Sequence, residues 1–216
     1  KVAKQYQASI TEYLNAVLLY SLLQKQEHDF HLRLRPVRIA MPVNLRRFFP
    51  SKTLRNFITM VYPSIDPRLG DYTFEEIVTQ VHHYMRYYIN SKFLRGDITT
   101  NASTQRNPLI RIVPLFLKDF VVRQFYQRVQ DKNSSAGLTN MGAIRVPDDM
   151  KPYLERFDIY MGIPYSQRTN CAIVSFEDTL TVNFASCIIE ADVERRFFQK
   201  LVEDGIPVTI ESNREL

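Results

Sequence analysis

The sequence is poor in the residues that cross-link small folds. It contains only two cysteines, Cys171 and Cys187, in 216 residues, which is too few for a disulfide scaffold. Both lie in apolar stretches, where a free cysteine packs as a small hydrophobic side chain. We therefore expect two buried free thiols. The sequence also has no internal repeat and no long low-complexity tract, which argues against a repeat protein.

Long hydrophobic runs are missing as well. A helix that spans a bilayer needs about 20 consecutive apolar residues, and no stretch of the chain approaches that length. The amino end, Lys1-Val2-Ala3-Lys4, lacks the apolar region of a secretory signal peptide. Together with the free thiols, this predicts a cytoplasmic protein without a membrane span. The chain also begins without a methionine, and we expect it to be a piece of a longer protein.

What is present is an ordinary globular composition, 45% hydrophobic and 24% charged. A chain of this length can bury a core without a metal or disulfide, and it predicts a single domain over residues 1–216. The net charge is +5, but Lys and Arg are scattered apart from small groups such as Arg33-Leu34-Arg35 and Arg46-Arg47. We expect no nucleic-acid partner, because these charges are not gathered into a patch. A modest positive field would suit a small anionic ligand equally well.

Apolar periodicity predicts four helices, at residues 9–27, 73–95, 113–131 and 190–204. The first begins with a capping box formed by Ser9 and Glu12, and the second with one formed by Thr73 and Glu76. Gly96 is expected to end the second helix as a left-handed cap residue, with irregular polar chain after it.

Alternating apolar residues predict strands at residues 37–45, 56–62, 137–146, 154–163, 170–176, 180–187 and 208–210. Two of them flank Glu177-Asp178-Thr179 and should form a hairpin. Pro42 cannot donate to a strand ladder, so its strand should lie at a sheet edge or carry a bulge. Helices gather early and strands late. This order predicts an α/β (α+β) fold, a mixed and largely antiparallel sheet with helices mainly on one face.

The most conspicuous polar pair is His82-His83. Adjacent residues on a helix point about 100° apart and cannot converge on one atom. A zinc site would also need histidines one turn apart and a further ligand. We therefore interpret both histidines as structural and expect no metal. The sequence offers no Ser-His-Asp arrangement and no phosphate-binding glycine loop.

Two further segments have polar residues at strand ends. In Thr139-Asn140-Met141-Gly142, a glycine within a strand marks either a bulge or a close approach of ligand or backbone, and the asparagine can both donate and accept. From the residues alone, a site and an ordinary strand corner are equally open. Arg46 ends the strand at 37–45 and is either a solvated charge or a fork that pins a neighbouring loop. Asn56 opens the next strand.

Taken together, these residues resemble the carboxyl-terminal half of the chloramphenicol-acetyltransferase-like superfamily. It includes plant coenzyme A acyltransferases, alcohol acetyltransferases and the condensation domains of peptide synthetases, and the alcohol acetyltransferase branch is the most similar. The resemblance rests on Val43-Asn44-Leu45-Arg46 followed by Asn56, on 139–144 in the place of the family's Asp-Phe-Gly-Trp-Gly stretch, and on the hairpin and helix after it. The family's catalytic signature, His-His-x-x-x-Asp-Gly, lies in the other half, and His82-His83 lacks its Asp and Gly.

This resemblance implies one half of a coenzyme A-dependent acyltransferase with no catalytic residue in this chain, inactive by itself. Asn140, Gly142, Arg46 and Asn56 would form one wall of the substrate tunnel, with Asn140 accepting a hydrogen bond from Arg46. Acyl-coenzyme A would be the co-substrate, an alcohol or amine the acceptor, and no cofactor would be bound covalently. The partner would be the missing amino-terminal half-domain, and the isolated half could form a homodimer. The alternative is a non-catalytic binding or assembly module with a condensation-like half-fold.

Overall fold

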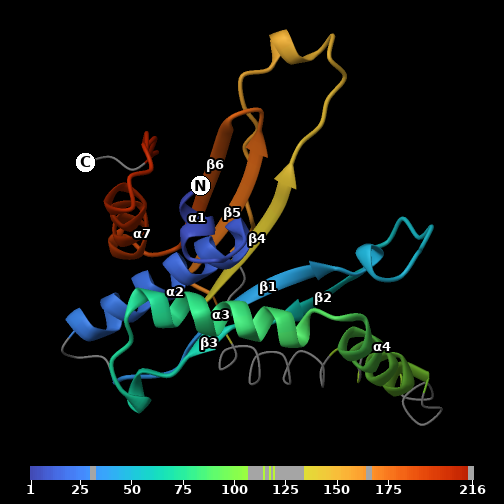
Figure 1. The fold of residues 1–216 in the computed structure, drawn as a ribbon. Helices are drawn as coiled ribbons and strands as arrows, with labels where there is room; N and C mark the ends of the chain where they lie inside the picture. Colours follow the sequence, from blue (N-terminus) through green and yellow to red (C-terminus); the bar gives the residue numbers. More distant parts are fainter. Residues whose placement is uncertain are drawn as a thin grey trace. The chain divides into compact units, whose positions relative to one another are not determined.

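The computed structural model describes residues 1–29, 33–106, 114, 117, 119, 134–163 and 167–213. The chain divides into two compact units, each assembled from segments distant in sequence. Figure 1 labels the helices and strands of the chain. The helical unit comprises Lys1–Val37, Ile65–His82 and Ile189–Leu216, and the sheet unit comprises Arg38–Ser64 and His83–Ile188. The predicted helix at 113–131 falls almost entirely outside the described residues.

Nearly all of the sheet belongs to the sheet unit. Its strands are β1 (Val37–Asn44), β2 (Ile58–Val61), β3 (Ser64–Ile65), β4 (Ala136–Ala143), β5 (Thr169–Phe176) and β6 (Thr179–Ser186). The order is β2-β1-β4-β5-β6, with β3 also pairing with β1. The β1–β2 and β5–β6 pairs are antiparallel, and the β1–β4 and β4–β5 pairs are parallel. The predicted mixed α/β fold class is confirmed, as is the hairpin, which turns at Glu177-Asp178.

Strand β1 is internal to the sheet, so the predicted edge position is wrong. It pairs with β2 on one side and β4 on the other. The pairing with β4 covers Ile39 and Ala40, however, and Pro42 lies beyond it, opposite Met60 of β2. The missing N–H is tolerated because this part of β1 is not paired with β4.

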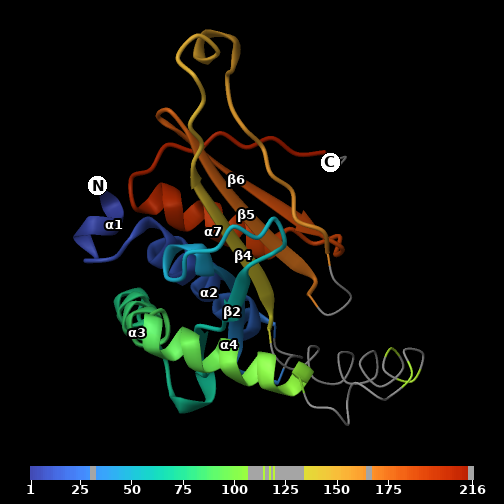
Figure 2. The same ribbon diagram turned by 90° about the vertical axis from the view of Figure 1, so that its right-hand side faces the viewer.

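Two predicted strands do not form among the described residues. Residues 154–163 have no strand pairing; they are the returning limb of an arm, residues 144–163, that extends beyond β4 (Figure 2). The ring of Phe157 packs against Phe176, with centroids 5.1 Å apart. The alternation in this segment therefore reflects packing on one side, without a ladder. Residues 208–210 also lack strand structure.

The predicted helix at 73–95 forms two helices, because the helical conformation is interrupted at Asn90. Helix α3 (Phe74–Tyr88) ends before this residue and α4 (Ser91–Arg106) begins after it. The side-chain oxygen of Asn90 accepts hydrogen bonds of 3.0 Å from two backbone N–H groups in the first turn of α4, as N-capping residues do. The prediction that Gly96 ends the helix is wrong, since Gly96 lies inside α4.

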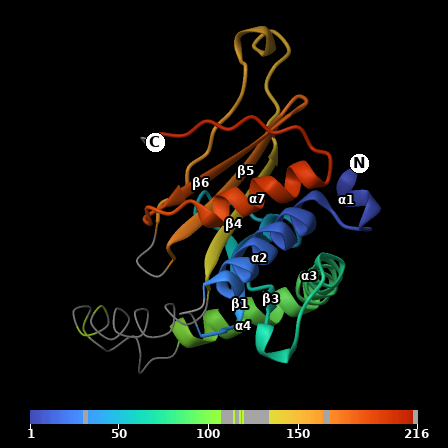
Figure 3. The same ribbon diagram turned by 90° about the vertical axis from the view of Figure 1, so that its left-hand side faces the viewer.

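The helical unit contains α1 (Val2–Gln5), α2 (Ile10–His28), the first part of α3 and α7 (Asp192–Glu203). Both predicted capping boxes form. Glu12 accepts from the N–H of Ser9 at 2.7 Å, and Glu76 from that of Thr73 at 2.8 Å. Helices α2 and α7 pack side by side (Figure 3). Phe197 and Leu201 of α7 are buried.

A buried polar group fastens α7 to α2. The carboxylate of Asp204 accepts hydrogen bonds from the Tyr13 hydroxyl at 2.6 Å and from Lys200 Nζ at 2.7 Å. The Tyr6 hydroxyl donates to it at 3.3 Å, and Lys200 Nζ lies 4.3 Å from the centroid of the Phe74 ring. Burial and the bond to Asp204 raise the pKa of Tyr13, so its hydroxyl remains a donor.

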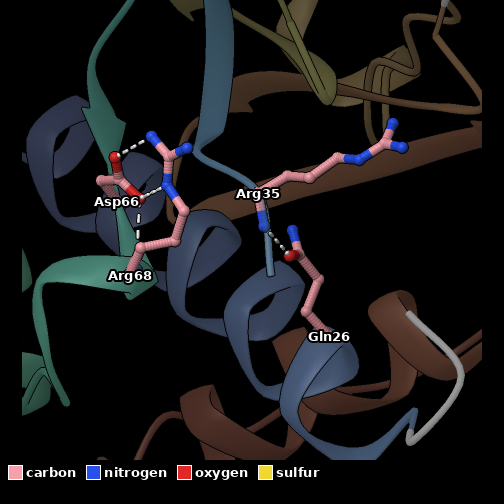
Figure 4. Close-up of polar contacts among 4 residues, drawn as sticks. All are labelled: Gln26, Arg35, Asp66 and Arg68. Carbon is pink, nitrogen blue, oxygen red and sulfur yellow. Dashed lines mark hydrogen bonds and ion pairs between the residues drawn. The ribbon is translucent and has the colours of Figure 1, made fainter. Parts of the chain in front are cut away.

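Two exposed polar contacts stabilise connecting segments of the helical unit (Figure 4). Asp66 accepts from the backbone N–H of Arg68 at 3.2 Å and from its Nε at 2.8 Å, capping the short helix η2 (Pro67–Leu69). The side-chain oxygen of Gln26 accepts from the N–H of Arg35 at 3.0 Å. The second contact ties the end of α2 to the segment that leads into β1.

The two cysteines have different surroundings. Cys171 is buried in β5, where burial raises the pKa of its thiol. Cys187 is exposed after β6, so the expectation of a buried thiol there is wrong. No helix among the described residues is long and apolar enough to cross a bilayer.

Candidate functional site

Strand β4 carries a bulge near its carboxyl end. Its pairing with β5 steps from Asn140 opposite Ile173 to Ala143 opposite Ser175, so β4 has one residue more than its neighbour. Gly142 lies in this bulge with φ +78°, a conformation that favours glycine. The side-chain oxygen of Asn140 accepts from the N–H of Gly142 at 2.8 Å. The sequence left a bulge and a close approach open for this glycine, and the structure has the bulge.

The bulge changes which side chains face solvent. Met141, within it, is 63% exposed, and the strand resumes its bonding to β5 through the N–H of Ile144, 2.8 Å from the Ser175 carbonyl. The chain then continues into the arm at 144–163. Bulges commonly redirect side chains next to functional sites, so the end of β4 is the best candidate for one face of a site.

Arg46 lies at the start of the loop between β1 and β2. Its guanidinium donates to the carbonyl oxygens of Thr53 at 2.9 Å and Arg55 at 2.7 Å. It is therefore the fork that pins a loop, one of the two interpretations left open. The expected hydrogen bond from Arg46 to Asn140 is replaced by these local bonds, because the guanidinium is directed at its own loop.

Asn56 is exposed on the same loop, two residues before β2. The four residues expected to share a wall thus belong to two local structures of the sheet unit, a pinned loop and a bulge. The loop and the bulge are each ordered by hydrogen bonds within their own segment. Motif spacing therefore pointed to both segments but gave no information on a contact between them.

His82 and His83 have separate surroundings. Nδ1 of His82 lies 3.3 Å from Oε2 of Glu12, the same oxygen that accepts from Ser9. His83 is exposed. Burial opposes ionisation of Glu12, but the hydrogen bonds from Ser9 and His82 outweigh it and lower the pKa of this carboxyl. His82 thus supports the capping box of α2, in agreement with a structural role.

A buried amide cluster at the start of β4 was missed by the sequence analysis. Asn170 of β5 is completely buried; its Oδ1 accepts from the N–H of Gly137 at 2.8 Å and its Nδ2 donates to the carbonyl of Gly162 at 2.9 Å. Nearby, Nε2 of Gln167 donates to the Ser134 hydroxyl at 2.6 Å. The cluster joins β4, β5 and the arm. An asparagine within an apolar strand is the signal that could have found it, because buried amides must be paired.

No family model and no curated protein matches the chain. Solved structures do match. The epimerization domain from the third module of tyrocidine synthetase B aligns with a TM-score of 0.53 at 10% identity, over 94% of this chain and 43% of that one. The wax ester synthase/diacylglycerol acyltransferase from Marinobacter aquaeolei VT8 aligns at 0.46 and 11% identity, over 95% and 46%. Vinorine synthase aligns at 0.48 and 10%, over 94% and 44%.

The chain therefore spans less than half the length of the solved chains that it matches. At this identity, the similarity to the epimerization domain shows the fold alone. That fold agrees with the one expected from the sequence. Over its own length, the chain shares the fold of part of that epimerization domain.

Proposed function

We propose that this chain is the carboxyl-terminal half of a coenzyme A-dependent acyltransferase that acylates an alcohol or an amine. One observation carries the proposal: the alignment to the epimerization domain takes in 94% of this chain but only 43% of the other. A half-fold of this kind supplies one face of a site, and a companion half-domain supplies the other. The alcohol acetyltransferase branch, suggested by the sequence motifs, is the proposed type.

The bulge and the pinned loop would form the wall of the substrate tunnel. Gly142 brings backbone without a Cβ to this position, and Asn140 holds it there at 2.8 Å. Arg46 keeps the loop closed through Thr53 and Arg55, beside Asn56. Their contribution is to position the substrates and exclude water, effects that are large when reacting groups are held in line.

The chemical step would take its general base from the companion half. An imidazole there removes the proton of the acceptor O–H or N–H while the oxygen or nitrogen attacks the thioester carbonyl. The tetrahedral intermediate then collapses, the C–S bond breaks, and the coenzyme A thiolate takes up the proton. Because such a base contributes about 10²–10⁴-fold, this chain alone should be nearly inactive.

The test is acyl transfer by the longest protein that the coding sequence encodes. The protein is incubated with acetyl-coenzyme A and a panel of short alcohols and amines, and both the released thiol and the acylated product are measured. We expect thiol release that depends on the acceptor. The substitution Asn140→Ala should lower kcat/KM about ten-fold by loosening the wall, whereas Asn183→Ala on β6 should leave it unchanged.

Failure of the folded protein to consume any thioester would reject the enzyme. It would favour the alternative, a binding or assembly module that keeps the same fold. Equal activity of the Asn140 and Asn183 variants would retain the enzyme but remove the bulge from its site.

A further inference from the structure

One stretch of the chain carries positive charge without any acidic residue. Residues 30–65 contain seven Lys or Arg and no Asp or Glu, although the whole chain has a net charge of only +5. Four of these cations lie in the basic loop, residues 45–57 between β1 and β2: Arg46, Arg47, Lys52 and Arg55. A loop with one sign of charge creates a local field that attracts an anionic partner.

The basic loop has a defined shape. The N–H of Leu45 donates to the carbonyl of Phe57 at 3.1 Å and closes the base, and Arg46 bonds to the carbonyls of Thr53 and Arg55. Figure 1 shows the loop extending past the ends of β1 and β2. Its four cations are exposed, and no described carboxylate forms an ion pair with any of them. The charges are therefore held on an ordered loop and available to an external partner.

The basic loop also exposes apolar side chains. Leu54, between Lys52 and Arg55, is fully exposed at 102%. Where the loop continues into β2, Ile58 and Met60 are 49% and 38% exposed, and their spacing places them on one face of the strand. Single exposed apolar residues are common on protein surfaces, but a leucine beside Lys and Arg combines an apolar side chain with charges that anionic lipids attract.

We propose that the basic loop binds the protein to an anionic membrane surface. Arg47, Lys52 and Arg55 would contact the lipid phosphates, each cation near such a surface adding to the attraction, while Leu54 enters the boundary between headgroups and acyl chains. A nucleic-acid backbone offers no apolar phase for Leu54, so the observations favour a lipid surface. The proposal concerns binding alone and does not depend on the acyltransferase assignment.

Vesicle sedimentation tests the contribution of charge. The protein should bind vesicles of phosphatidylcholine with one-third phosphatidylserine and bind pure phosphatidylcholine far less, and salt should weaken the binding because it screens exposed charges. The double substitution Arg47→Gln and Lys52→Gln should lower the partition coefficient about five-fold per charge. The control, Lys92→Gln with Arg95→Gln, removes two exposed cations of α4 and should have no effect.

A second set of variants tests the apolar side chain. Leu54→Ser should weaken binding to anionic vesicles about ten-fold, while Leu69→Ser, at a 79% exposed leucine outside the loop, should not. The chain contains no tryptophan, so Leu54→Trp creates a single fluorescent reporter. Its emission should shift to shorter wavelength when anionic vesicles are added.

Three results would overturn the proposal. The first is equal binding to neutral and anionic vesicles. The second is loop variants that bind as well as their folded controls, together with indole emission from the Leu54→Trp variant that vesicles leave unchanged. The third is binding of duplex DNA or inorganic polyphosphate without any vesicle binding. Circular dichroism melts that match the wild type establish that each exposed substitution leaves the fold intact.

Discussion

The side-chain oxygen of Asn170 fills the space that a Cβ atom at Gly137 would occupy. The two residues are register partners on β5 and β4. Oδ1 of Asn170 accepts from the N–H of Gly137 at 2.8 Å, and it would lie only 2.6 Å from an added Cβ. Glycine is required at this position for space, so that a side-chain amide can approach the neighbouring backbone.

Replacing Gly137 by alanine should therefore destabilise the protein. Crowding in a packed interior costs about 1–3 kcal/mol, and we expect a loss of that size in the free energy of unfolding measured with urea. The matched control is Gly96→Ala, because an added Cβ inside α4 has no heavy atom within 4 Å. It should stabilise by about 0.5–1 kcal/mol. Effects of equal sign at the two sites would contradict this account.

Removing the Asn170 side chain should also be damaging. Asn170→Ala leaves the buried N–H of Gly137 without its partner, whereas water can replace the lost donor at the carbonyl of the exposed Gly162. One unpaired buried polar group costs about 1–3 kcal/mol, so we expect a loss of that size and faster hydrogen exchange at the Gly137 amide. Asn183→Ala, whose side chain bonds to exposed Asp158, should cost less than about 0.5 kcal/mol. Unchanged exchange at Gly137 would show that another group holds the strand.

Features determined by neighbouring residues were predictable from the sequence. The capping box of Ser9 and Glu12 spans one helical turn, and the hairpin turns over Glu177-Asp178. The bulge at Gly142, where φ is positive, was one of the alternatives that the sequence left open. In each case the bonds that define the structure join residues close in sequence.

Features determined by distant partners were not predictable. The break between α3 and α4 is an exception, because the bonds of Asn90 that make it are local and the apolar periodicity, which continues across Asn90, concealed it. Alternation at 154–163 looks the same whether a strand pairs or only packs on one side. The residues of the candidate site were hard to predict for the same reason. Asn170 finds Gly137 33 positions away in sequence, and which interpretation of Arg46 holds depends on the conformation of residues 53–55.

The carboxylate of Asp204 should be critical to the helical unit. Lys200 and Asp204 are only 13% and 10% exposed, so Asp204→Ala would leave a buried charge unpaired and remove the acceptor of Tyr13. Breaking one partner of a buried pair costs about 3–5 kcal/mol, and thermal or urea unfolding should show a loss of this size. The control is Asp66→Ala, which removes the surface pair with Arg68 seen in Figure 4 and should cost far less, because water screens exposed charges. Similar losses in both variants would refute the central role of Asp204.

Because of Glu12, the free energy of unfolding should decrease at low pH. The pKa of Glu12 in the folded chain is lowered relative to the unfolded value of about 4.3. The folded state therefore binds fewer protons, and the stabilisation is fully present above the unfolded pKa and lost as the pH falls through the folded pKa. Unfolding free energies measured from neutral pH down to about pH 3 should decline in the wild type, and Glu12→Gln should flatten that decline.

A matched substitution separates the role of His82 from that of capping. Glu76 occupies the same position in the capping box of α3, is exposed, and has a pKa lowered by hydrogen bonds from Thr73. Glu76→Gln should therefore remove a smaller part of the acid dependence than Glu12→Gln, since solvent screens the exposed carboxylate. If the Glu12→Gln protein loses stability in acid as steeply as the wild type, the bonds from Ser9 and His82 do not hold this carboxylate in its charged form.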